Sequence, residues 1–249
     1  MIVTGASRGR GIGAALARRA VAAGAAVVVH AWSPADAEQP WGEDGGFASG
    51  LVVELRSAGR AILVQEDFAD PDAPARVLAA ARDAFGHVDA LVANHARSSE
   101  QTLEHLTAAE LDLCHAVNTR ATLLLVQQFA AQHDGRPGGR VVLFTSGQYH
   151  GAMPAELPYI ATKATLHELT RSLAVELMPR GITVNCIDPG PNDTGYASDD
   201  VRAAVAERHP AGRWGTPADT GKLVGWLLSD EADWVTGQTI ASDGGWSAR

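Results

Sequence analysis

A serine, a tyrosine and a lysine stand at a spacing that suits proton transfer to or from a small molecule. Ser146 follows an apolar run, Tyr159 lies 13 residues further on, and Lys163 follows after four more. On a helix, residues four apart share a face, so Tyr159 and Lys163 are expected to point the same way. A phenol has a pKa of about 10 and is a poor acid–base group at neutral pH. A neighbouring ammonium favours the phenolate, and we expect it to lower the pKa of Tyr159 towards the working range.

The serine and one further residue, Asn118, complete this candidate catalytic cluster. The Ser146 hydroxyl would hold the substrate oxygen beside the phenol. Asn118 lies in an earlier helical stretch, residues 108–133, and would close a proton relay to Lys163 through water. Catalysis would then combine placement of the substrate with a tuned acid.

The substrate is expected to meet residues on both sides of this cluster. Tyr149 and His150 follow Ser146 on a loop, where substrate contact and a plain surface position are equally open. Residues 195–214 form the expected substrate-covering segment, with a helical stretch at 199–209 between turn-rich ends. Trp214, at the end of that segment, lines a substrate pocket or packs in the core.

A glycine-rich turn joins the first apolar run to the first helical stretch. Residues 4–13 read TGASRGRGIG, and Gly24 ends the helix that follows. Glycines at such a turn let the backbone approach a pyrophosphate, which then sits on the N–H groups of the helix. Two registers fit the glycines. We favour the one in which Gly11 and Gly13 open the helix and Gly9–Arg10 bulges outward, because ten residues then separate Gly13 from Gly24.

The end of the second apolar run bears on the choice of nucleotide. Residues 30–33 read HAWS, and the first acid beyond them is Asp36. An NAD site usually places an acid at this strand end for the ribose hydroxyls, whereas an NADP site uses cationic or hydroxyl groups. We therefore expect NADP(H), with NAD(H) as the alternative. The arginines of the glycine-rich turn, Arg8 and Arg10, either help to bind the extra phosphate or are simply solvated loop charges. The groups nearest this point are Arg8, Arg10, His30 and Ser33.

Apolar runs alternate with helical stretches along the whole chain. Continuously apolar runs are typical of strands buried on both faces, and repeated strand–helix alternation predicts a parallel sheet covered by helices on both sides. Residues 33–46 are expected to form an exposed loop, and 134–139 a tight turn. The expected strands are 1–4, 25–30, 61–64, 88–93, 140–145, 182–187 and 238–241, and the expected helices 13–23, 51–58, 75–85, 108–133 and 159–178.

Composition narrows the class of protein. The 249 residues are 46% hydrophobic and 20% charged, which favours one globular α/β domain, 1–249. A net charge of −9 disfavours nucleic acid and anionic membranes as partners. The two cysteines form no CxxC and the nine histidines no HExxH, so we expect no disulfide and no metal. With no apolar run of membrane-spanning length and no leader, a cytoplasmic protein is expected.

Taken in order, these motifs resemble the short-chain dehydrogenase/reductase family, including members like the 3-oxoacyl-acyl-carrier-protein reductases. The resemblance covers nearly the whole chain. It rests on TGASRGRGIG at 4–13, Asp67, Ala93–Asn94, Asn118, Ser146, Tyr159 with Lys163, Pro189–Gly190 with Thr194, and SDGG at 242–245. One departure is His95, which stands where the family usually has a small residue; it would narrow the cofactor cleft or reach the substrate.

The resemblance implies a doubly wound, seven-stranded Rossmann fold, a homotetramer or homodimer, and a role for each matched residue. Asn118, Ser146, Tyr159 and Lys163 would be the catalytic tetrad, and Lys163 would also bond the nicotinamide ribose. Substrate contacts would come from Ser146, Tyr149, His150 and Trp214. The cofactor would be bound by Gly5, Ser7, Arg8, Gly11, Ile12, Gly13, His30, Trp32, Ser33, Asp67, Phe68, Asn94, Ala96, Tyr159, Lys163, Pro189, Gly190 and Thr194.

The sequence thus predicts an enzyme that reduces a ketone, either a 3-oxoacyl thioester or a secondary-metabolite ketone, with Tyr159 as general acid and a small molecule as its partner. Three alternatives stay open. One is an NAD-dependent alcohol dehydrogenase working towards the ketone. Another is a nucleotide-binding sensor without catalysis, which would not need all four tetrad groups. The third is a dehalogenase or other lyase, which would replace Lys163 and lose the glycine loop.

Overall fold

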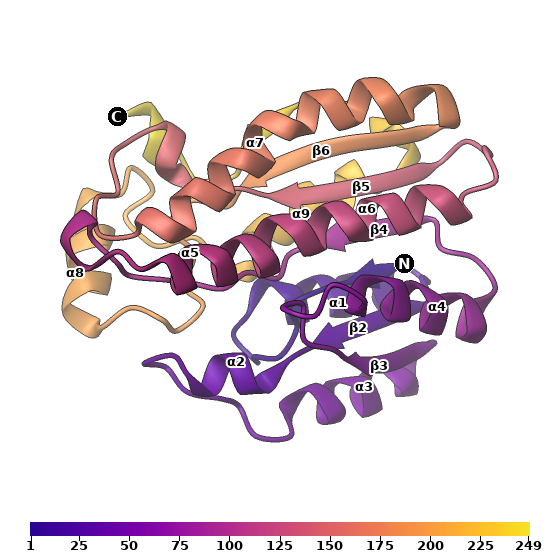
Figure 1. Ribbon diagram of the computed structural model, residues 1–249, viewed down its shortest axis with the longest axis horizontal. Coiled ribbons are helices and arrows are strands. Elements are labelled where there is room, and N and C mark those ends of the chain that lie inside the picture. Colours follow the sequence, from indigo (N-terminus) through magenta and orange to yellow (C-terminus); the bar gives the residue numbers. More distant parts are fainter.

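Seven parallel strands form a single sheet in the order β3-β2-β1-β4-β5-β6-β7 (Figure 1). The computed structural model describes all 249 residues. The order reverses direction between β1 and β4, which creates the crevice where doubly wound sheets bind ligands. The predicted doubly wound fold is confirmed, with strand ends shifted by one or two residues. The strands are β1 (Ile2–Val3), β2 (Val27–Ala31), β3 (Ala61–Gln65), β4 (Ala90–Ala93), β5 (Gly139–Phe144), β6 (Ile182–Asp188) and β7 (Thr239–Ala241).

The first strand is only two residues long, yet it holds the centre of the sheet. Ile2 lies opposite Val28 of β2 on one side and Leu91 of β4 on the other. The Thr4 N–H extends the pairing by donating to the Val92 carbonyl at 3.0 Å. The chain therefore leaves β1 at the switch point itself, directly into the glycine-rich turn.

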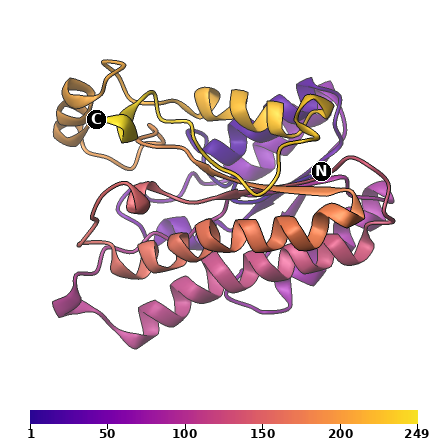
Figure 2. The ribbon, with the colours of Figure 1, turned by 90° about the horizontal axis from the view of Figure 1, so that it is seen from above.

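Helices cover both faces of the sheet, as its continuously apolar strands require (Figure 2). Helices α1, α3 and α9 pack on one face, and α4, α6 and α7 on the other. The helices are α1 (Ile12–Ala22), α2 (Ser33–Ala37), α3 (Phe47–Ala58), α4 (Ala73–Phe85), α5 (Ala108–Cys114), α6 (Ala121–Gln132), α7 (Leu157–Leu177), α8 (Asp199–Arg208) and α9 (Pro217–Leu227). Short helical turns are η1 (Leu103–His105), η2 (His115–Arg120), η3 (Gly147–Tyr149), η4 (Met178–Arg180), η5 (Asp230–Ala232) and η6 (Trp246–Ala248).

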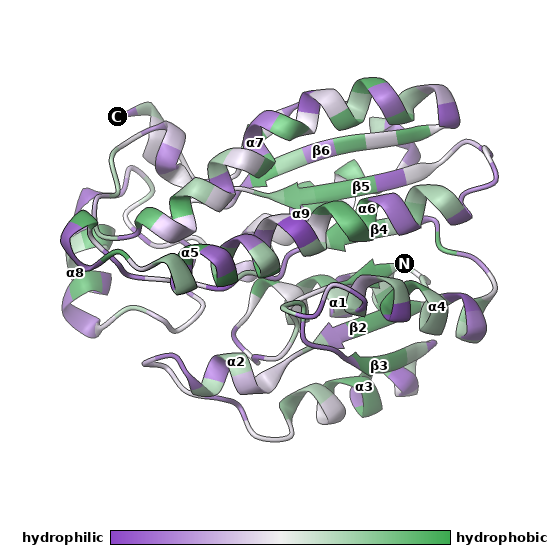
Figure 3. Ribbon diagram, viewed as in Figure 1, coloured by the Kyte–Doolittle hydropathy of each residue, from purple (hydrophilic) through white to green (hydrophobic).

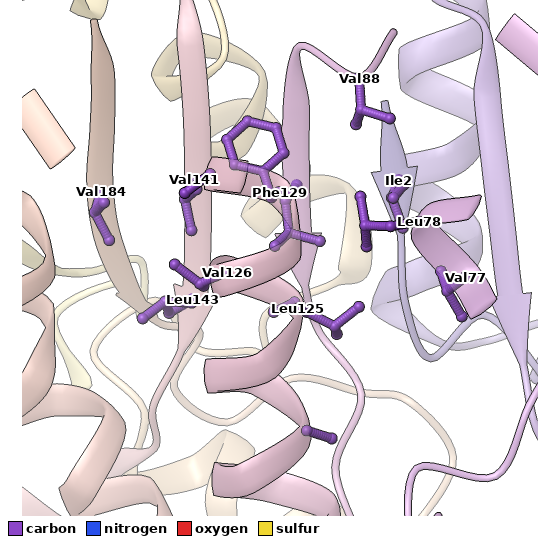
Figure 4. Packing of buried hydrophobic residues seen from close by; sticks show 14 of the residues in the cluster. Ile2, Val77, Leu78, Val88, Leu125, Val126, Phe129, Val141, Leu143 and Val184 are labelled. Carbon is purple, nitrogen blue, oxygen red and sulfur yellow. The ribbon is translucent and has the colours of Figure 1, made fainter. Parts of the chain in front are cut away.

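One of the two cores lies between α6 and the middle strands. Phe129 and Leu125 of α6 are fully buried against Val141 and Leu143 of β5, and Ile2 closes the cluster from β1 (Figure 4). The strands are mostly hydrophobic, whereas hydrophobic and hydrophilic residues alternate along the helices (Figure 3). No helix combines the length and apolar character that crossing a membrane requires.

Three segments differ from the sequence prediction. Residues 108–133 are not one α-helix, because the π-helical turn η2 separates α5 from α6. Residues 33–46 are not simply an exposed loop, because α2 forms at their start, where Pro34 occupies the first turn of the helix. Gly139, placed in the turn after α6 by prediction, already belongs to β5. The first two differences both alter the site.

Candidate active site

The predicted catalytic residues gather at the carboxyl edge of the sheet, where α8 and the chain's C-terminus also lie (Figure 1). Two cavities open there. One, of about 380 Å³, runs beside the glycine-rich turn and has Tyr159 on its wall. The other, of about 790 Å³, has Ser146 on its wall. The Ser146 hydroxyl interacts with the Tyr159 phenol, so each cavity has one member of this pair on its wall.

Lys163 is fixed beneath Tyr159 by the end of β5. Its Nζ donates to the Phe144 carbonyl at 3.0 Å and lies 5.6 Å from the centre of the Tyr159 ring. In return, the Thr145 hydroxyl donates to the Lys163 carbonyl at 2.9 Å. This reciprocal pair of bonds joins α7 to the strand that carries Ser146. The predicted juxtaposition of Ser146, Tyr159 and Lys163 is therefore present in the structure.

Burial controls the protonation of the tyrosine and the lysine. It raises the pKa of the Tyr159 phenol above its usual value, and the hydrogen bond with Ser146 offsets only part of that rise. The expected lowering of this pKa is not seen, because loss of solvation on burial is the largest cause of the shift. Burial also lowers the pKa of Lys163 to about 8. At neutral pH the phenol therefore keeps its proton, which is the state that a general acid needs.

Asn118 lies in the π-helical turn η2 and is fully buried. Its Oδ1 accepts the Arg97 N–H at 2.6 Å, and its Nδ2 donates to the Arg97 carbonyl at 3.0 Å and to the Thr162 hydroxyl at 2.9 Å. These bonds tie the loop after β4 to α7, one residue before Lys163. The relay from Asn118 to Lys163 through water stays a prediction.

The glycine-rich turn adopts the register favoured from the helix length. Helix α1 begins at Ile12 with Gly11 as its N-cap, while the Arg10 side chain is more than half exposed. A Cβ on Gly13 would lie 2.4 Å from the Gly5 carbonyl oxygen, so only glycine lets the helix approach the strand this closely. No side chain caps the helix and no acid lies in its first turn, which leaves its N–H groups free for an anion.

Most residues predicted to bind the cofactor line the cavity beside this turn. They come from the turn itself, the ends of β2, β3 and β4, helix α7 and the segment after β6. The predicted residues on the wall are Gly5, Ser7, Arg8, Gly11, Ile12, His30, Trp32, Asp67, Phe68, Asn94, Ala96, Tyr159 and Thr194.

Five predicted cofactor residues lie off this wall. Gly13 supports the turn from behind, and Lys163 lies beneath Tyr159. Gly190 lines the larger cavity instead, where its positive φ and its contact with Asp243 exclude a side chain. The remaining two, Ser33 and Pro189, line neither cavity.

Two histidines form part of the cavity floor. His30 is 2% exposed and stacks on Phe68 with ring centroids 4.0 Å apart. Burial lowers its pKa to about 4, so it is a neutral ring and not the phosphate-binding cation considered from the sequence. His95 also contacts Phe68, at 4.3 Å between centroids. Its ring nitrogens bond the Thr4 hydroxyl and the Val117 carbonyl, and its ring lines the same cavity.

The segment after β2 adds residues that sequence order did not suggest. Helix α2 turns Asp36 back into the cavity, where its carboxylate accepts a hydrogen bond from Ser7. Trp41 joins the same wall, with the Arg8 guanidinium 5.0 Å from its ring centre. The available signal was Pro34, because a proline directly after a serine is typical of a helix start.

The arginines of the glycine-rich turn have different environments. Arg8 is half-buried on the cavity wall and donates to the Thr194 carbonyl at 2.7 Å. Arg10 points outward and pairs with Asp193 at 2.7 Å. Of the two, only Arg8 can meet a ligand in this cavity.

The larger cavity contains the predicted Ser146, His150 and Trp214. The Trp214 indole is held by a 2.8 Å bond to the Arg202 carbonyl of α8, so the covering segment supplies it. Tyr149, also predicted to contact substrate, is not on the wall, because its ring packs against His150 and His167.

Comparison with known proteins agrees with this architecture. Residues 5–247 match the family model described as Enoyl-(Acyl carrier protein) reductase. The oxidoreductase YjdA of Bacillus subtilis (strain 168) is 36% identical over 246 residues, covering 98% of this chain and 95% of YjdA.

Two solved structures are also similar over the whole chain. The reductase LugOII, described as catalysing keto-reduction at C1 during lugdunomycin biosynthesis, superposes with a TM-score of 0.87 at 32% identity, covering 100% of this chain and 97% of its own. The angucycline C-6 ketoreductase LanV, solved with bound NADP, gives 0.86 at 30% identity, covering 100% and 95%.

The bonds of Asn118 predict a structural role that can be measured. Replacing Asn118 by Ala leaves the N–H and the carbonyl of Arg97 without the amide that bonds them, and we expect the free energy of unfolding to fall by about 1–3 kcal/mol. Gln127→Ala, which removes an exposed amide of neighbouring α6, is the control and should change stability little. Urea unfolding measures both; equal stabilities of the two variants would show that the Asn118 bonds do not hold this loop.

Proposed function

The chain belongs to the short-chain dehydrogenase/reductase family, and we propose that within it the chain reduces a ketone to a secondary alcohol with NADPH. One observation carries the proposal: a half-buried, protonated phenol on the wall of the cavity beside the glycine-rich turn interacts with a serine hydroxyl on the wall of the larger cavity. The keto-reduction named for LugOII and the ketoreductase name of LanV support the same reaction.

The residues beside the glycine-rich turn fit a dinucleotide. The uncapped start of α1 suits a pyrophosphate, and Gly5 and Gly11 present no side chain to it. Asp67 and Phe68 would flank the adenine, and Asn94 would line the cleft. When bound, NADPH supplies the hydride that reduces the carbonyl carbon.

The chain's own groups would handle the oxygen of the ketone. The Ser146 hydroxyl would donate a hydrogen bond to that oxygen, and Tyr159 would deliver its proton as negative charge develops there. Lys163, charged below a pH of about 8, would stabilise the phenolate left behind and bond the nicotinamide ribose. Its bond to Phe144 holds the ammonium in place for both tasks.

The preference for NADPH over NADH is proposed from Arg8. This half-buried guanidinium lines the cavity close to Trp41, near the end of β2, where a ribose phosphate would lie. The NADP bound to LanV supports that preference. Asp36, also on the wall, favours the alternative of an NAD-dependent dehydrogenase, because a carboxylate repels a phosphate and accepts ribose hydroxyls. A non-catalytic sensor is disfavoured, because the full set of acid–base groups is assembled.

Removing the phenolic hydroxyl tests the proton donor. Tyr159→Phe should lower kcat for NADPH-dependent reduction of an aromatic ketone by about 10²- to 10⁴-fold, because the general acid is lost. Binding of NADPH should change little. Tyr149→Phe, a neighbouring tyrosine off the cavity walls, should keep most of the activity. If Tyr159→Phe retained a near-normal rate, Tyr159 would not be the acid.

Changing the charge at the ribose end tests the nucleotide. Arg8→Ala should weaken NADPH binding by roughly tenfold or more, the loss expected for one charge-assisted hydrogen bond, and leave NADH binding nearly unchanged. Arg10→Ala is the matched control, since it removes the neighbouring arginine that points away. Fluorescence titration with both reduced nucleotides measures the effect. An equal loss for NADPH and NADH, or tighter binding of NADH by the unaltered protein, would contradict NADPH preference.

A further inference from the structure

The mouth of the larger cavity carries two arginines and no acid. Arg208 and Arg249 are both exposed there, whereas Ser146 is half-buried deeper in the same cavity. None of the lining residues is Asp or Glu, although the chain as a whole has a net charge of −9. Two arginine side chains that share one cavity favour an anionic ligand there.

The two arginines differ from the nearby Arg202 in their charged partners. Arg202, one and a half turns before Arg208 on α8, pairs with Asp193 at 3.1 Å and with Asp199 at 3.4 Å. Neither Arg208 nor Arg249 takes part in any ion pair of the protein. Arg208 ends α8, and the helix dipole accounts for a cation at that point. It does not account for a second cation brought to the same cavity from the far end of the chain.

The second cation is held in position before any ligand binds. The Arg249 guanidinium carbon lies 3.3 Å from the centre of the Trp246 ring, and its Nε donates to the Trp246 carbonyl at 2.9 Å. Stacking leaves the outer edge of the guanidinium free to form two parallel hydrogen bonds with a carboxylate or a phosphate. Less ordering of the side chain is then required when an anion binds.

The rest of the cavity is suited to an apolar body. Met153, Val201, Val205, Trp214 and Trp246 share the wall with the two arginines. A substrate with its ketone at Ser146 would lay its hydrophobic part along these side chains and present its far end at the mouth.

We propose that the substrate is an aromatic ketone with an anionic group, a carboxylate or a phosphate, at the end remote from the carbonyl, and that Arg208 and Arg249 bind this group. The inference rests on the proposed ketone reduction for the position of the carbonyl. The two arginines therefore select among ketones, and Tyr159 with Ser146 performs the chemistry.

Three probes with one aromatic body separate the possibilities: 6-acetyl-2-naphthoate, 6-acetyl-2-naphthyl phosphate and the neutral methyl ester of the naphthoate. Calorimetric titration without nucleotide measures binding, and NADPH oxidation measures turnover. We expect at least one anionic probe to bind tenfold or more tightly than the ester, with an affinity that falls as salt is added. The preferred anion, carboxylate or phosphate, identifies the group that the site takes.

Single substitutions assign the effect to the arginines. Arg208→Gln and Arg249→Gln should each weaken binding of the anion about tenfold and change binding of the ester less than twofold; Arg208→Lys should restore part of the loss. Arg82→Gln is the matched control, an exposed arginine of α4 far from the cavity, and should change neither affinity. Equal binding of ester and anions by the unaltered protein, or equal losses for all three probes in the variants, would overturn the proposal.

The experiments distinguish a failure of the anion site from a failure of the proposed ketone reduction. Arginine-dependent binding of the anion without oxidation of NADPH would support the anion site and contradict the proposed ketone reduction. Reduction of the ester at the same kcat/KM as the anions, unchanged in both glutamine variants, would support the reaction and overturn the anion site.

Discussion

The arrangement of the site depends on one reciprocal contact between α7 and the end of β5. Lys163 donates to the Phe144 carbonyl, and Thr145 donates back to the Lys163 carbonyl. Because Ser146 directly follows these strand residues, the same contact fixes the serine against Tyr159, one helical turn from the lysine. Without it, the acid and the group that holds the substrate oxygen would belong to two elements free to separate.

Burial gives this contact its chemical consequence. The phenol of Tyr159 loses solvation and holds its proton, while the pKa of Lys163 falls to about 8. A protonated phenol suits delivery of a proton to a developing alkoxide, which is the reductive direction. The opening of the larger cavity is solvated, unlike the surroundings of Tyr159 and Lys163, because Arg208 and Arg249 remain exposed and charged there. Under the proposed function, the chemistry at Tyr159 and Ser146 would thus be separated in space from the selection of the substrate by the two arginines.

Local signals in the sequence predicted the sheet, its order of elements and the meeting of Tyr159 with Lys163, because strand burial and helical spacing are read from neighbouring residues. The remaining features depend on contacts distant in sequence. Asp36 reaches the cavity only because α2 reverses the chain after β2. The bonds of Asn118 depend on a π-helical turn that periodicity does not reveal. His30 is neutral because the folded sheet buries it, although by residue type it is a cation candidate.

The central claim is that this chain directs hydride from a nicotinamide to a carbonyl carbon while Tyr159 protonates the oxygen. The most direct measurement follows an isotope: the protein is incubated with 6-acetyl-2-naphthoate and NADPH deuterated at both positions of C4, and the alcohol is examined by NMR and mass spectrometry. The account predicts one deuterium on the carbinol carbon and a solvent proton on the oxygen. An alcohol whose carbinol carbon carries only solvent hydrogen, or consumption of NADPH without an alcohol, would contradict it.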